Sequence, residues 1–375
     1  MPAARNILIV GGGISGMTLA IALRRAGLQC EVVELTPEWT VPGVGISLQG
    51  ATLRALGTLG TLDPCITQGF GYSHFIACDA QGNVTGKVDL PRLCGPDYPA
   101  TIGIMRQILH DVLKDAMAET GVPVRLGVTV TALEQSGDKV AATFTDGTHG
   151  SYDLVVGADG AFSVVRELIF GADAGPQYTG QAVWRITCAR PPEVQARHSF
   201  FGKLNKSGFN PVSQTQMYIY IVQNLPEFAR LTDEELPKVM QAQLAEFGGL
   251  LGVARDSVRD VSDIVYRPIH SHILPPPWHR GRVVLIGDAA HTTTPHLASG
   301  AGIAVEDSVV LAQELAAADD LDAALSKFMT RRYERCRLIV GNSHTLGEWE
   351  KAPDTPGADP IGLINQSYRA LAQPI

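Results

Sequence analysis

Residues 6–16 read Asn-Ile-Leu-Ile-Val-Gly-Gly-Gly-Ile-Ser-Gly, a short apolar run that is followed at once by glycines. The apolar run predicts a strand that is buried on both faces of a parallel sheet. From Ile14 to Ala26 the apolar residues suit a packed helix, Gly27 can cap its end, and Cys30 to Glu34 is a second buried strand. The start of the chain therefore predicts a strand, turn, helix and strand unit, which is right-handed in nearly every known case.

The glycines of this stretch fit the pattern G-x-G-x-x-G, placed after a strand and at the start of a helix, as a dinucleotide site requires. Gly11 would make the tight turn, Gly13 would let a pyrophosphate approach the backbone, and Gly16 would bring helix and strand close together. The helix N-terminus at Ile14 and Ser15 would face the phosphate charge. The alternative is a glycine-rich turn that binds no ligand.

Glu34 ends the second strand, 18 residues after Gly16, where a carboxylate can accept hydrogen bonds from the 2′- and 3′-hydroxyls of a ribose. A 2′-phosphate would bring two negative groups together, so NADP is disfavoured at this site. The first two strands and the helix between them do not distinguish FAD from NAD as the bound dinucleotide.

Composition narrows the class of protein. The 375 residues allow two or three domains, or one large domain with insertions, and 45% hydrophobic with 18% charged residues is an ordinary globular profile. The net charge of −8 and the lack of a basic run beyond Arg331-Arg332 argue against a nucleic-acid partner. No apolar run reaches 18 residues and the N-terminus has no leader features, so we expect a cytoplasmic protein without membrane contact.

The chain has six scattered cysteines, and no spacing of His, Cys and carboxylate residues resembles a metal site. We therefore expect reduced cysteines and no bound metal. Glycine is frequent, at 39 of 375 residues. Its clusters suggest places where the backbone must approach a ligand closely.

Later segments predict further strands. Short runs at 128–133, 140–144 and 152–156 are separated by turn residues, which predicts an antiparallel meander. In Gly71–Leu90 and Gly180–Val265, β-branched and aromatic residues alternate with polar ones, which predicts a second sheet. The pattern of the first unit returns in a buried strand at 282–286 and a helix from about Gly302 to Ala317.

Two further motifs accompany the glycine fingerprint. Residues 153–166 read Asp-Leu-Val-Val-Gly-Ala-Asp-Gly-Ala-Phe-Ser-Val-Val-Arg, and residues 281–291 read Gly-Arg-Val-Val-Leu-Ile-Gly-Asp-Ala-Ala-His. Together the three resemble, in order and near the usual spacing, the signatures of the class A flavoprotein monooxygenases, the para-hydroxybenzoate hydroxylase family. The resemblance covers the chain to about residue 345, and three ordered motifs are far more specific than one.

The resemblance implies FAD as the cofactor and assigns it residues. Asp288 matches the acid that hydrogen-bonds a ribityl hydroxyl, and Asp159 looks like the acid of the Asp-Gly pair between FAD and the incoming nicotinamide nucleotide. Arg106 resembles the arginine that opens a helix beside the ribityl and phosphate groups. Pro295 and the stretch Gly300-Ala301-Gly302 would lie beside the isoalloxazine ring, where backbone N–H groups can stabilise negative charge on reduced flavin. Read alone, Asp159 is a β-turn residue and Asp288 a helix N-cap.

The substrate side has its own candidates. Residues 295–300 resemble the Pro-His-x-Ala-x-Gly stretch of N-heteroaromatic hydroxylases related to 6-hydroxynicotinate 3-monooxygenase, which implies that His296 contacts the substrate. That subgroup has a histidine where this chain has Ser47, so the substrate itself is left open. Tyr218 and Tyr220 project from one face of a predicted strand and could both reach a pocket, or could be core aromatics. Arg185 is a candidate contact to an anion or to the flavin.

The implied activity is hydroxylation of a small electron-rich aromatic or N-heteroaromatic ring, a phenol or hydroxypyridine, through a flavin C4a-hydroperoxide. NADH or NADPH would bind transiently as electron donor, and O₂ would supply the oxygen. His296, Tyr218 and Tyr220 are the candidate bases or orienting groups. The alternatives are a flavoprotein of the same fold with different chemistry (a halogenase or isoprenoid reductase), an NAD-dependent dehydrogenase, and a non-catalytic nucleotide-binding module.

The fold that the resemblance implies is α/β. It comprises a Rossmann-like FAD-binding domain of the glutathione-reductase type, built from separated segments, a smaller β-sheet substrate domain and C-terminal helices. We assign residues 1–70, 100–175 and 266–345 to the FAD-binding domain, 71–99 and 176–265 to the substrate-binding domain, and 346–375 to a helical tail. The chain is expected to be a monomer or a homodimer.

Overall fold

The structure is a computed structural model that describes residues 4–41, 43–203, 205–256, 258 and 264–375. One layer is a six-stranded sheet, made of β1 (Asn6–Val10), β2 (Gln29–Glu34), β8 (Val124–Leu126), β12 (Leu154–Gly157), β18 (His279–Arg280) and β19 (Val283–Leu285). The strand order is β18-β19-β12-β1-β2-β8, and all pairs are parallel except β18 with β19. The predicted α/β fold, with a parallel sheet built from separated segments, is confirmed.

The first unit of this sheet forms as predicted. Helix α1 (Ile14–Arg25) follows β1, and its end is marked by Gly27 at φ 79°, a backbone region that suits glycine. Helix α1 packs against α4 (Arg106–Glu119) and α8 (Gly300–Ala317). Helix α8 begins at Gly300, two residues before the predicted start at Gly302, and α4 begins at Arg106, as the resemblance implies.

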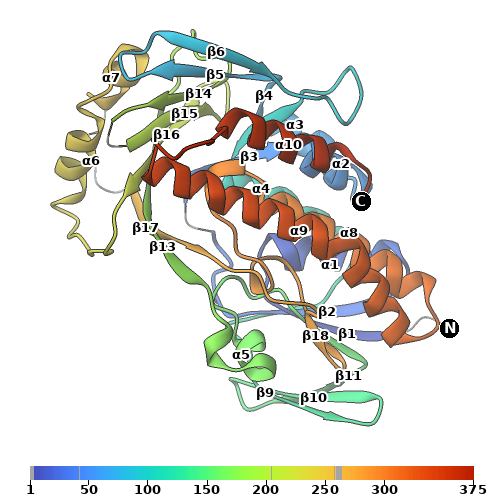
Figure 1. The fold of residues 1–375 in the computed structure, drawn as a ribbon. Helices are drawn as coiled ribbons and strands as arrows, with labels where there is room; N and C mark the ends of the chain where they lie inside the picture. The colour runs from blue at the N-terminus through green and yellow to red at the C-terminus, as the bar shows by residue number, and fades with distance from the viewer. Residues whose placement is uncertain (1–3, 42, 204, 257, 259–263) are drawn as a thin grey trace.

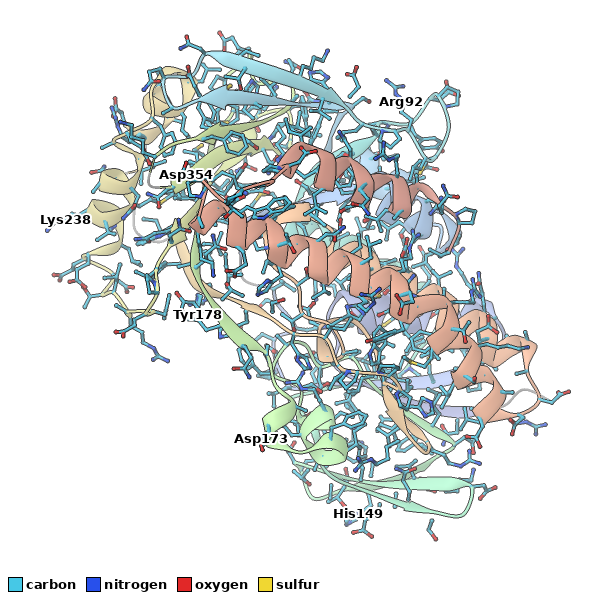
Figure 2. The ribbon with its side chains drawn as sticks, in the orientation of Figure 1. Arg92, His149, Asp173, Tyr178, Lys238 and Asp354 are labelled. Atoms are coloured by element: carbon cyan, nitrogen blue, oxygen red, sulfur yellow. The ribbon has the colours of Figure 1, made fainter. Side chains whose placement is uncertain are left out.

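The predicted meander is wrong at its third run. Its strands are β9 (Val130–Ser136), β10 (Lys139–Phe144) and β11 (His149–Tyr152), whereas β12 belongs to the parallel sheet. Asp153 separates β11 from β12, and its Oδ2 accepts hydrogen bonds from the backbone N–H groups of Arg5 (2.8 Å) and Asn6 (2.9 Å). The chain is therefore redirected beside β1. Figures 1 and 2 show the meander at the lower edge of the molecule, with His149 on its outer side.

A seven-stranded sheet forms the second layer. It consists of β5 (His74–Asp79), β6 (Val84–Asp89), β13 (Gln177–Ala189), β14 (Arg197–Phe201), β15 (Asn205–Pro211), β16 (Gln216–Asn224) and β17 (Val265–Ser271), in the order β17-β13-β16-β15-β14-β5-β6. The predicted second sheet is thus present, and β17 extends it past residue 265. Whether the domains divide at the predicted boundaries stays a prediction.

Two helices lie within the stretch that was predicted as strands alone. These are α6 (Leu236–Leu244) and α7 (Gly249–Arg255), and residues 257 and 259–263 of that stretch lie outside the described residues. Met240 and Leu251 of these helices share a buried core with Trp184 and Phe200 of the sheet. Figure 2 shows Lys238, on the opposite side of α6, pointing away from the sheet. The helices therefore cover one face of the second layer.

A small sheet joins the two layers. It consists of β3 (Gly45–Gln49), β4 (Phe70–Tyr72) and β7 (Thr101–Met105), in the order β3-β7-β4. At Gly103 an added Cβ would lie 2.0 Å from the carbonyl oxygen of Pro211 on β15. This approach requires glycine, because real Cβ atoms do not come so close to backbone. Helices α2 (Gly50–Thr58) and α3 (Leu62–Gln68) pack against this sheet, whereas α5 (Val164–Phe170) packs against β9 and β19.

The C-terminal part of the chain is helical. Helix α9 (Leu321–Lys351) crosses the front of the molecule in Figure 1, and α10 (Pro360–Ala372) lies beside it, over α2. The predicted start of a tail at residue 346 falls inside α9, which continues as one helix to Lys351. Within the described residues, no helix is long and apolar enough to cross a membrane.

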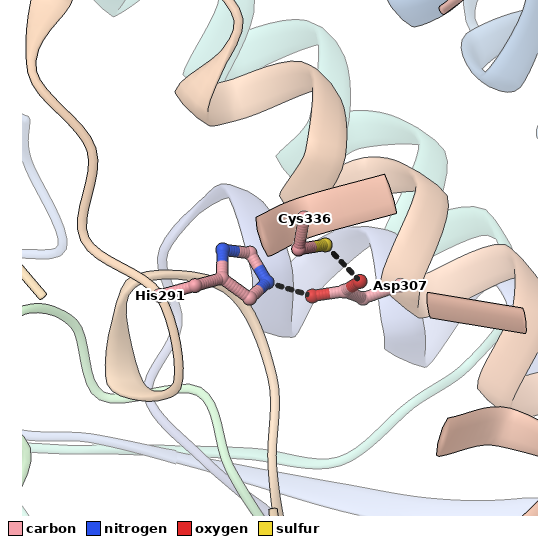
Figure 3. Close-up of side chains that lie close together, drawn as sticks. All are labelled: His291, Asp307 and Cys336. Atoms are coloured by element: carbon pink, nitrogen blue, oxygen red, sulfur yellow. Dashed lines mark hydrogen bonds and ion pairs between the residues drawn. The ribbon is translucent and has the colours of Figure 1, made fainter. Parts of the chain in front are cut away.

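A buried ionic cluster ties α8 and α9 to the loop after β19 (Figure 3). The Nε2 atom of His291 lies 2.6 Å from Oδ2 of Asp307, and Asp307 Oδ1 accepts a hydrogen bond of 2.7 Å from Nε of Arg332. Cys336 Sγ lies 3.8 Å from the same carboxylate and 3.4 Å from a nitrogen of Arg332. The sequence analysis missed this grouping of His, Asp and Cys. Arg332 donates to Asp307 and to Cys336, and His291 is paired with Asp307, so each of the three groups has a hydrogen-bond partner within the protein.

The charges in this cluster stabilise one another. Burial opposes the charge on His291, but the acidic groups of Cys336 and Asp307 outweigh it and hold the imidazole pKa well above its usual range. Burial would also raise the pKa of Asp307, but His291 and Arg332 outweigh burial and lower it. Because both partners are fully buried, removing one leaves an uncompensated charge.

Asp307→Asn should therefore lower the free energy of unfolding by about 3–5 kcal/mol. The stabilisation from Asp307 is lost as the pH falls through its lowered folded pKa, and that from His291 is lost as the pH rises through its raised one. The difference between wild type and variant should thus be largest between about pH 4 and pH 6.5. Urea unfolding followed by circular dichroism, at several pH values, measures it.

Glu334→Gln is the matched control, since it breaks an ion pair with Arg337 of 2.7 Å in which both side chains are more than half exposed. That variant should unfold like the wild type, because exposed pairs contribute little. Equal destabilisation by the two substitutions would contradict a structural role for the buried cluster.

Candidate functional site

A cavity of about 570 Å³ lies between the six-stranded layer and the seven-stranded sheet. This volume is typical of a small-molecule or cofactor site. From the first layer and its loops it is lined by Gly13, Ile14, Ser15, Arg106, Ala158, Gly160, Ala161, Phe162, Asp288, Pro295, Ser299, Gly300 and Ala301. From the second sheet it is lined by Val183, Arg185, Arg197, Lys206, Asn210, Tyr218, Tyr220, Val222, Arg267, Pro268, Ile269 and His270.

The glycine fingerprint has the backbone geometry that its pattern predicts. Gly11 has φ 108°, and an added Cβ there would lie 2.5 Å from the carbonyl oxygen of Ala158. At Gly16 an added Cβ would lie 1.8 Å from the carbonyl oxygen of Gly11, so helix and strand meet here. At Gly13 an added Cβ would meet no atom within 4 Å. The two outer glycines are thus required by packing, whereas Gly13 faces open space in the cavity.

Glu34 holds the fingerprint turn. Its Oε2 accepts a hydrogen bond of 2.6 Å from the N–H of Gly12, and its Oε1 accepts one of 2.7 Å from Thr36. Trp39 donates from Nε1 to the carbonyl oxygen of Gly12 at 2.9 Å. The half-buried carboxylate lies outside the set of described residues that line the cavity. Trp39 was missed because no motif marks it.

Three helices begin at this cavity, and the first N–H of α4, that of Arg106, donates to the carbonyl oxygen of Val44 at 3.3 Å. In the structure as described, no side chain caps the N-terminus of α1 at Gly13, α4 at Met105 or α8 at Ser299. The first residues of each helix, Ile14, Arg106 and Gly300, line the cavity. Unpaired N–H groups and the helix dipole both favour negative charge. The arrangement fits FAD, which carries a diphosphate and a flavin ring that becomes negative on reduction.

The two predicted acids differ in position. Asp288 projects into the cavity, enclosed by protein on the other sides, and burial raises the pKa of its carboxyl group against the opposing charges of His291 and Arg106. Asp159 lies behind the lining instead. Its Oδ1 accepts a hydrogen bond of 2.5 Å from Ser163 and its Oδ2 one of 3.0 Å from the N–H of Val165, so it organises the start of α5. Its neighbour Gly160, at φ 80°, lines the cavity in its place.

Tyr218 and Tyr220 of β16 both line the cavity, with ring centroids 6.4 Å apart. The Nδ2 atom of Asn210 donates to the hydroxyl oxygen of Tyr218 at 2.6 Å. The hydroxyl of Tyr220 lies 2.8 Å from Oγ of Ser199. Since Tyr218 accepts from the amide, its own proton is free to be donated to a ligand.

The structure does not bring His296 into the lining with the tyrosines. Its side chain is buried, with Nδ1 2.8 Å from Oγ1 of Thr294 and Nε2 3.1 Å from Oε2 of Glu350 on α9. Burial, which outweighs the opposing charge of Glu350, lowers the pKa of this imidazole. Glu350 also forms an ion pair with Lys206 of β15. The base role of His296 stays a prediction, and this geometry favours a positioning role.

Positive charge dominates the lining. Ser47 and Arg185 lie there as predicted, and sequence reasoning missed Arg197, Lys206 and Arg267. Counting only described residues, the lining has five basic side chains, including Arg106, and one carboxylate, Asp288. One signal in the sequence could have found Lys206. Residues 206 and 210 are four apart on a strand, so their side chains share one face and both line the cavity.

The comparisons with known proteins agree with this geometry. A family model described as "FAD binding domain" matches residues 5–342. Aurachin C monooxygenase/isomerase of Stigmatella aurantiaca is 30% identical over 359 residues, which is 94% of this chain and 92% of that protein. The 3-amino-4-hydroxybenzoate 2-monooxygenase of Streptomyces cremeus is 31% identical over 364 residues, which is 94% of this chain and 89% of that protein.

Among solved structures, HpxO of Klebsiella pneumoniae in complex with FAD and uric acid superimposes with a TM-score of 0.85 at 25% identity, covering 98% of this chain and 92% of that chain. Both the fold and the cofactor predicted from the motifs are thereby confirmed. The three ordered motifs, the cavity bordered by uncapped helices and the family match together show that the chain belongs to the class A FAD-dependent aromatic monooxygenases.

Proposed function

We propose that this protein hydroxylates a small, electron-rich aromatic or N-heteroaromatic ring of the phenol or hydroxypyridine type, with NADH or NADPH as a transient electron donor. The balanced reaction is ring C–H + NAD(P)H + H⁺ + O₂ → ring C–OH + NAD(P)⁺ + H₂O. Bound FAD supplies the chemistry, since it accepts two electrons from the nicotinamide and passes one oxygen atom of O₂ to the ring. The observation that carries the proposal is one cavity shared by uncapped helix N-termini and two strand tyrosines.

The relatives support a ring substrate. By their names, one acts on 3-amino-4-hydroxybenzoate and another on aurachin C, and HpxO was solved with uric acid. These substrates differ in size and charge, so the ring class is what they share. The identity of the substrate must come from the residues of this chain.

On the cofactor side, each residue has a binding task. The N-terminus of α1 at Gly13, Ile14 and Ser15 would hold the diphosphate through backbone N–H groups. Asp288 would accept a hydrogen bond from the ribityl chain. The N-terminus of α8 at Gly300 and Ala301 would stabilise negative charge on the ring edge without a side chain in the way.

On the substrate side, Tyr218 would orient the ring hydroxyl. Its phenol accepts from Asn210 at 2.6 Å, which leaves its O–H to donate to the substrate oxygen. Tyr220, on the same face of β16, would line the same wall beside it. His296 would act through Glu350 and Lys206 as a positioning residue, because both of its ring nitrogens are engaged.

Tyr218→Phe should lower the yield of hydroxylated product per NAD(P)H oxidised by about tenfold or more, because a positioned side chain that transfers a proton typically contributes about 10²–10⁴-fold. Product by chromatography, divided by nucleotide oxidised, measures this coupling. Tyr266→Phe is the control, since that hydroxyl donates to the carbonyl oxygen of Ala229 at 3.1 Å on the sheet edge. Unchanged coupling in Tyr218→Phe would remove the tyrosine from the mechanism.

Gly13→Ala should weaken FAD binding by about tenfold or more, or about 1.4 kcal/mol, while leaving the fold intact. The added methyl group meets no protein atom within 4 Å, so only a ligand can clash with it. Quenching of flavin fluorescence on titrating apoprotein gives the Kd. Gly341→Ala in α9 is the matched control, because it too meets no atom within 4 Å. Equal FAD affinity in both variants would contradict a diphosphate site at Gly13.

A further inference from the structure

Glu350, in the last turn of α9, contacts residues of both cavity walls. Its Oε1 accepts a hydrogen bond from Nζ of Lys206 on β15, and its Oε2 lies 3.1 Å from Nε2 of His296. Lys206 lines the cavity from the second sheet, and Pro295, the neighbour of His296, lines it from the first layer. Glu350 itself is not among the described residues of the lining. One carboxylate thus joins the two walls from behind.

The end of α9 is fixed against the second sheet. Nδ2 of Asn224 on β16 donates to the backbone carbonyl oxygen of Glu350 at 3.2 Å. The next residue, Lys351, donates from Nζ to the carbonyl oxygen of Thr179 on β13 at 2.8 Å. These contacts hold the backbone of the last helical turn, so the carboxylate of Glu350 reaches both walls from a fixed point.

A chain of hydrogen bonds in the loop before α8 ends on Glu350. Oγ of Ser343, about two turns earlier on α9, donates to the carbonyl oxygen of Thr294 at 2.8 Å. Oγ1 of Thr294 lies 2.8 Å from Nδ1 of His296, an imidazole whose pKa is lowered by burial. Because a carboxylate can only accept, Nε2 of the neutral ring carries the proton and Nδ1 accepts from the threonine hydroxyl. Glu350 is therefore the final acceptor for donors from both walls.

The same loop carries a strained residue at the cavity. Ala298 lines the cavity with φ 49°, a left-handed conformation that is uncommon for a residue with a Cβ. Such conformations persist where the surrounding structure fixes them. The contacts of Thr294 and His296 to α9 lie just before Ala298 and contribute to that fixing. The shape of this wall thus depends on α9.

Glu350 also balances the charge of the cavity. The described lining has five basic side chains and one carboxylate, and Lys206 is one of the five. Burial alone would raise the pKa of Glu350, but the neighbouring Lys206 and His296 outweigh burial and lower that pKa to about 2. The carboxylate is therefore charged at neutral pH and neutralises Lys206. Without it, the ammonium group would add one uncompensated positive charge to the cavity.

We propose that Glu350 is a positioning residue of this enzyme, which holds Lys206 of the substrate wall and His296 of the opposite loop in place and compensates the charge of the lysine. Glu350 acts through these two residues, because it lies outside the lining. The inference rests on the proposed function where hydroxylation is measured. The effect of its charge on bound flavin can be measured without turnover.

The first experiment measures the reduction potential of the bound FAD by equilibration with a redox dye, without substrate or oxygen. Reduced flavin carries negative charge, so added positive charge stabilises it. Glu350→Gln leaves Lys206 unpaired and should favour the reduced form by about tenfold, which is about 30 mV for a two-electron couple. Lys206→Met leaves the carboxylate unpaired and should shift the potential in the opposite direction. The double variant removes both charges and should return close to the wild-type potential.

A second experiment separates charge from geometry. Glu350→Asp keeps the charge but shortens the side chain, so the potential should stay near that of the wild type. Product formed per NAD(P)H oxidised should fall by about twofold or more, because a displacement of about 1 Å in a site can cost up to about 10²-fold in rate. Product by chromatography, divided by nucleotide oxidised, measures this coupling.

Glu348→Gln is the matched control, because it removes a carboxylate from the same end of α9. Glu348 is exposed and pairs with Lys351 at 2.7 Å. This variant should keep both the potential and the coupling of the wild type. FAD content and melting temperature confirm that each variant is folded. If Glu350→Gln loses FAD, the double variant should recover it, because the unpaired ammonium of Lys206 is then the cause.

Several outcomes would overturn the role of Glu350: wild-type potentials in both single variants, shifts of the same sign, or loss of FAD that the double variant does not recover. A purely structural ion pair would change the melting temperature without opposite shifts of potential. If a ring is hydroxylated while the potentials and the coupling of the Glu350 variants stay unchanged, the proposed function stands and the role of Glu350 fails. If the opposite shifts are found but no hydroxylated product forms under O₂ and NAD(P)H, the charge role stands and the proposed function fails.

Discussion

The meeting of the N-termini of α1, α4 and α8 at one cavity is the constraint on which the rest of the structure depends. Their dipoles point into one cavity, and in the described residues no side chain caps them. Such an arrangement is costly unless an anionic ligand completes it. Gly11 and Gly16 allow the turn before α1 to form, because an added Cβ would lie 2.5 Å and 1.8 Å, respectively, from a backbone carbonyl oxygen. Helix α1 starts at the carboxyl end of the parallel strand β1, which is where ligands bind in α/β sheets.

Much of the first layer could be predicted from sequence because its signals are local. A buried strand, a glycine turn and a helix within residues 6–34 fix one another through short-range geometry. Arg106 and Asp288 were found through ordered motifs, and both line the cavity. The predicted meander is wrong at Tyr152–Val156 because the break depends on Asp153 binding the backbone N–H of Asn6 at the start of β1, a contact over 147 residues that no local pattern encodes.

The substrate side was harder to predict for the same physical reason. Arg185, Arg197 and Lys206 come from three strands, and they share a wall only because β16 and β15 lie between β13 and β14. For His296, the motif predicted the position of the loop but not the direction of the side chain. Its motif marked a loop correctly, but the side chain is directed toward α9 by Glu350, which lies 54 residues away in sequence. A motif can therefore locate a loop at the site without specifying which way its side chains point.

Gly103 has a consequence for the size of the cavity. Strand β7 and the end of β15 touch there with only 2.0 Å available for a Cβ atom. Any side chain at position 103 would push Pro211 away. Pro211 ends β15, and Asn210 and Lys206 of that strand line the cavity. The width of the cavity therefore depends on the absence of a side chain at Gly103, which is not among the described residues that line the cavity. A substitution at Gly103 could therefore widen the cavity for larger ligands while every residue that lines the cavity stays the same.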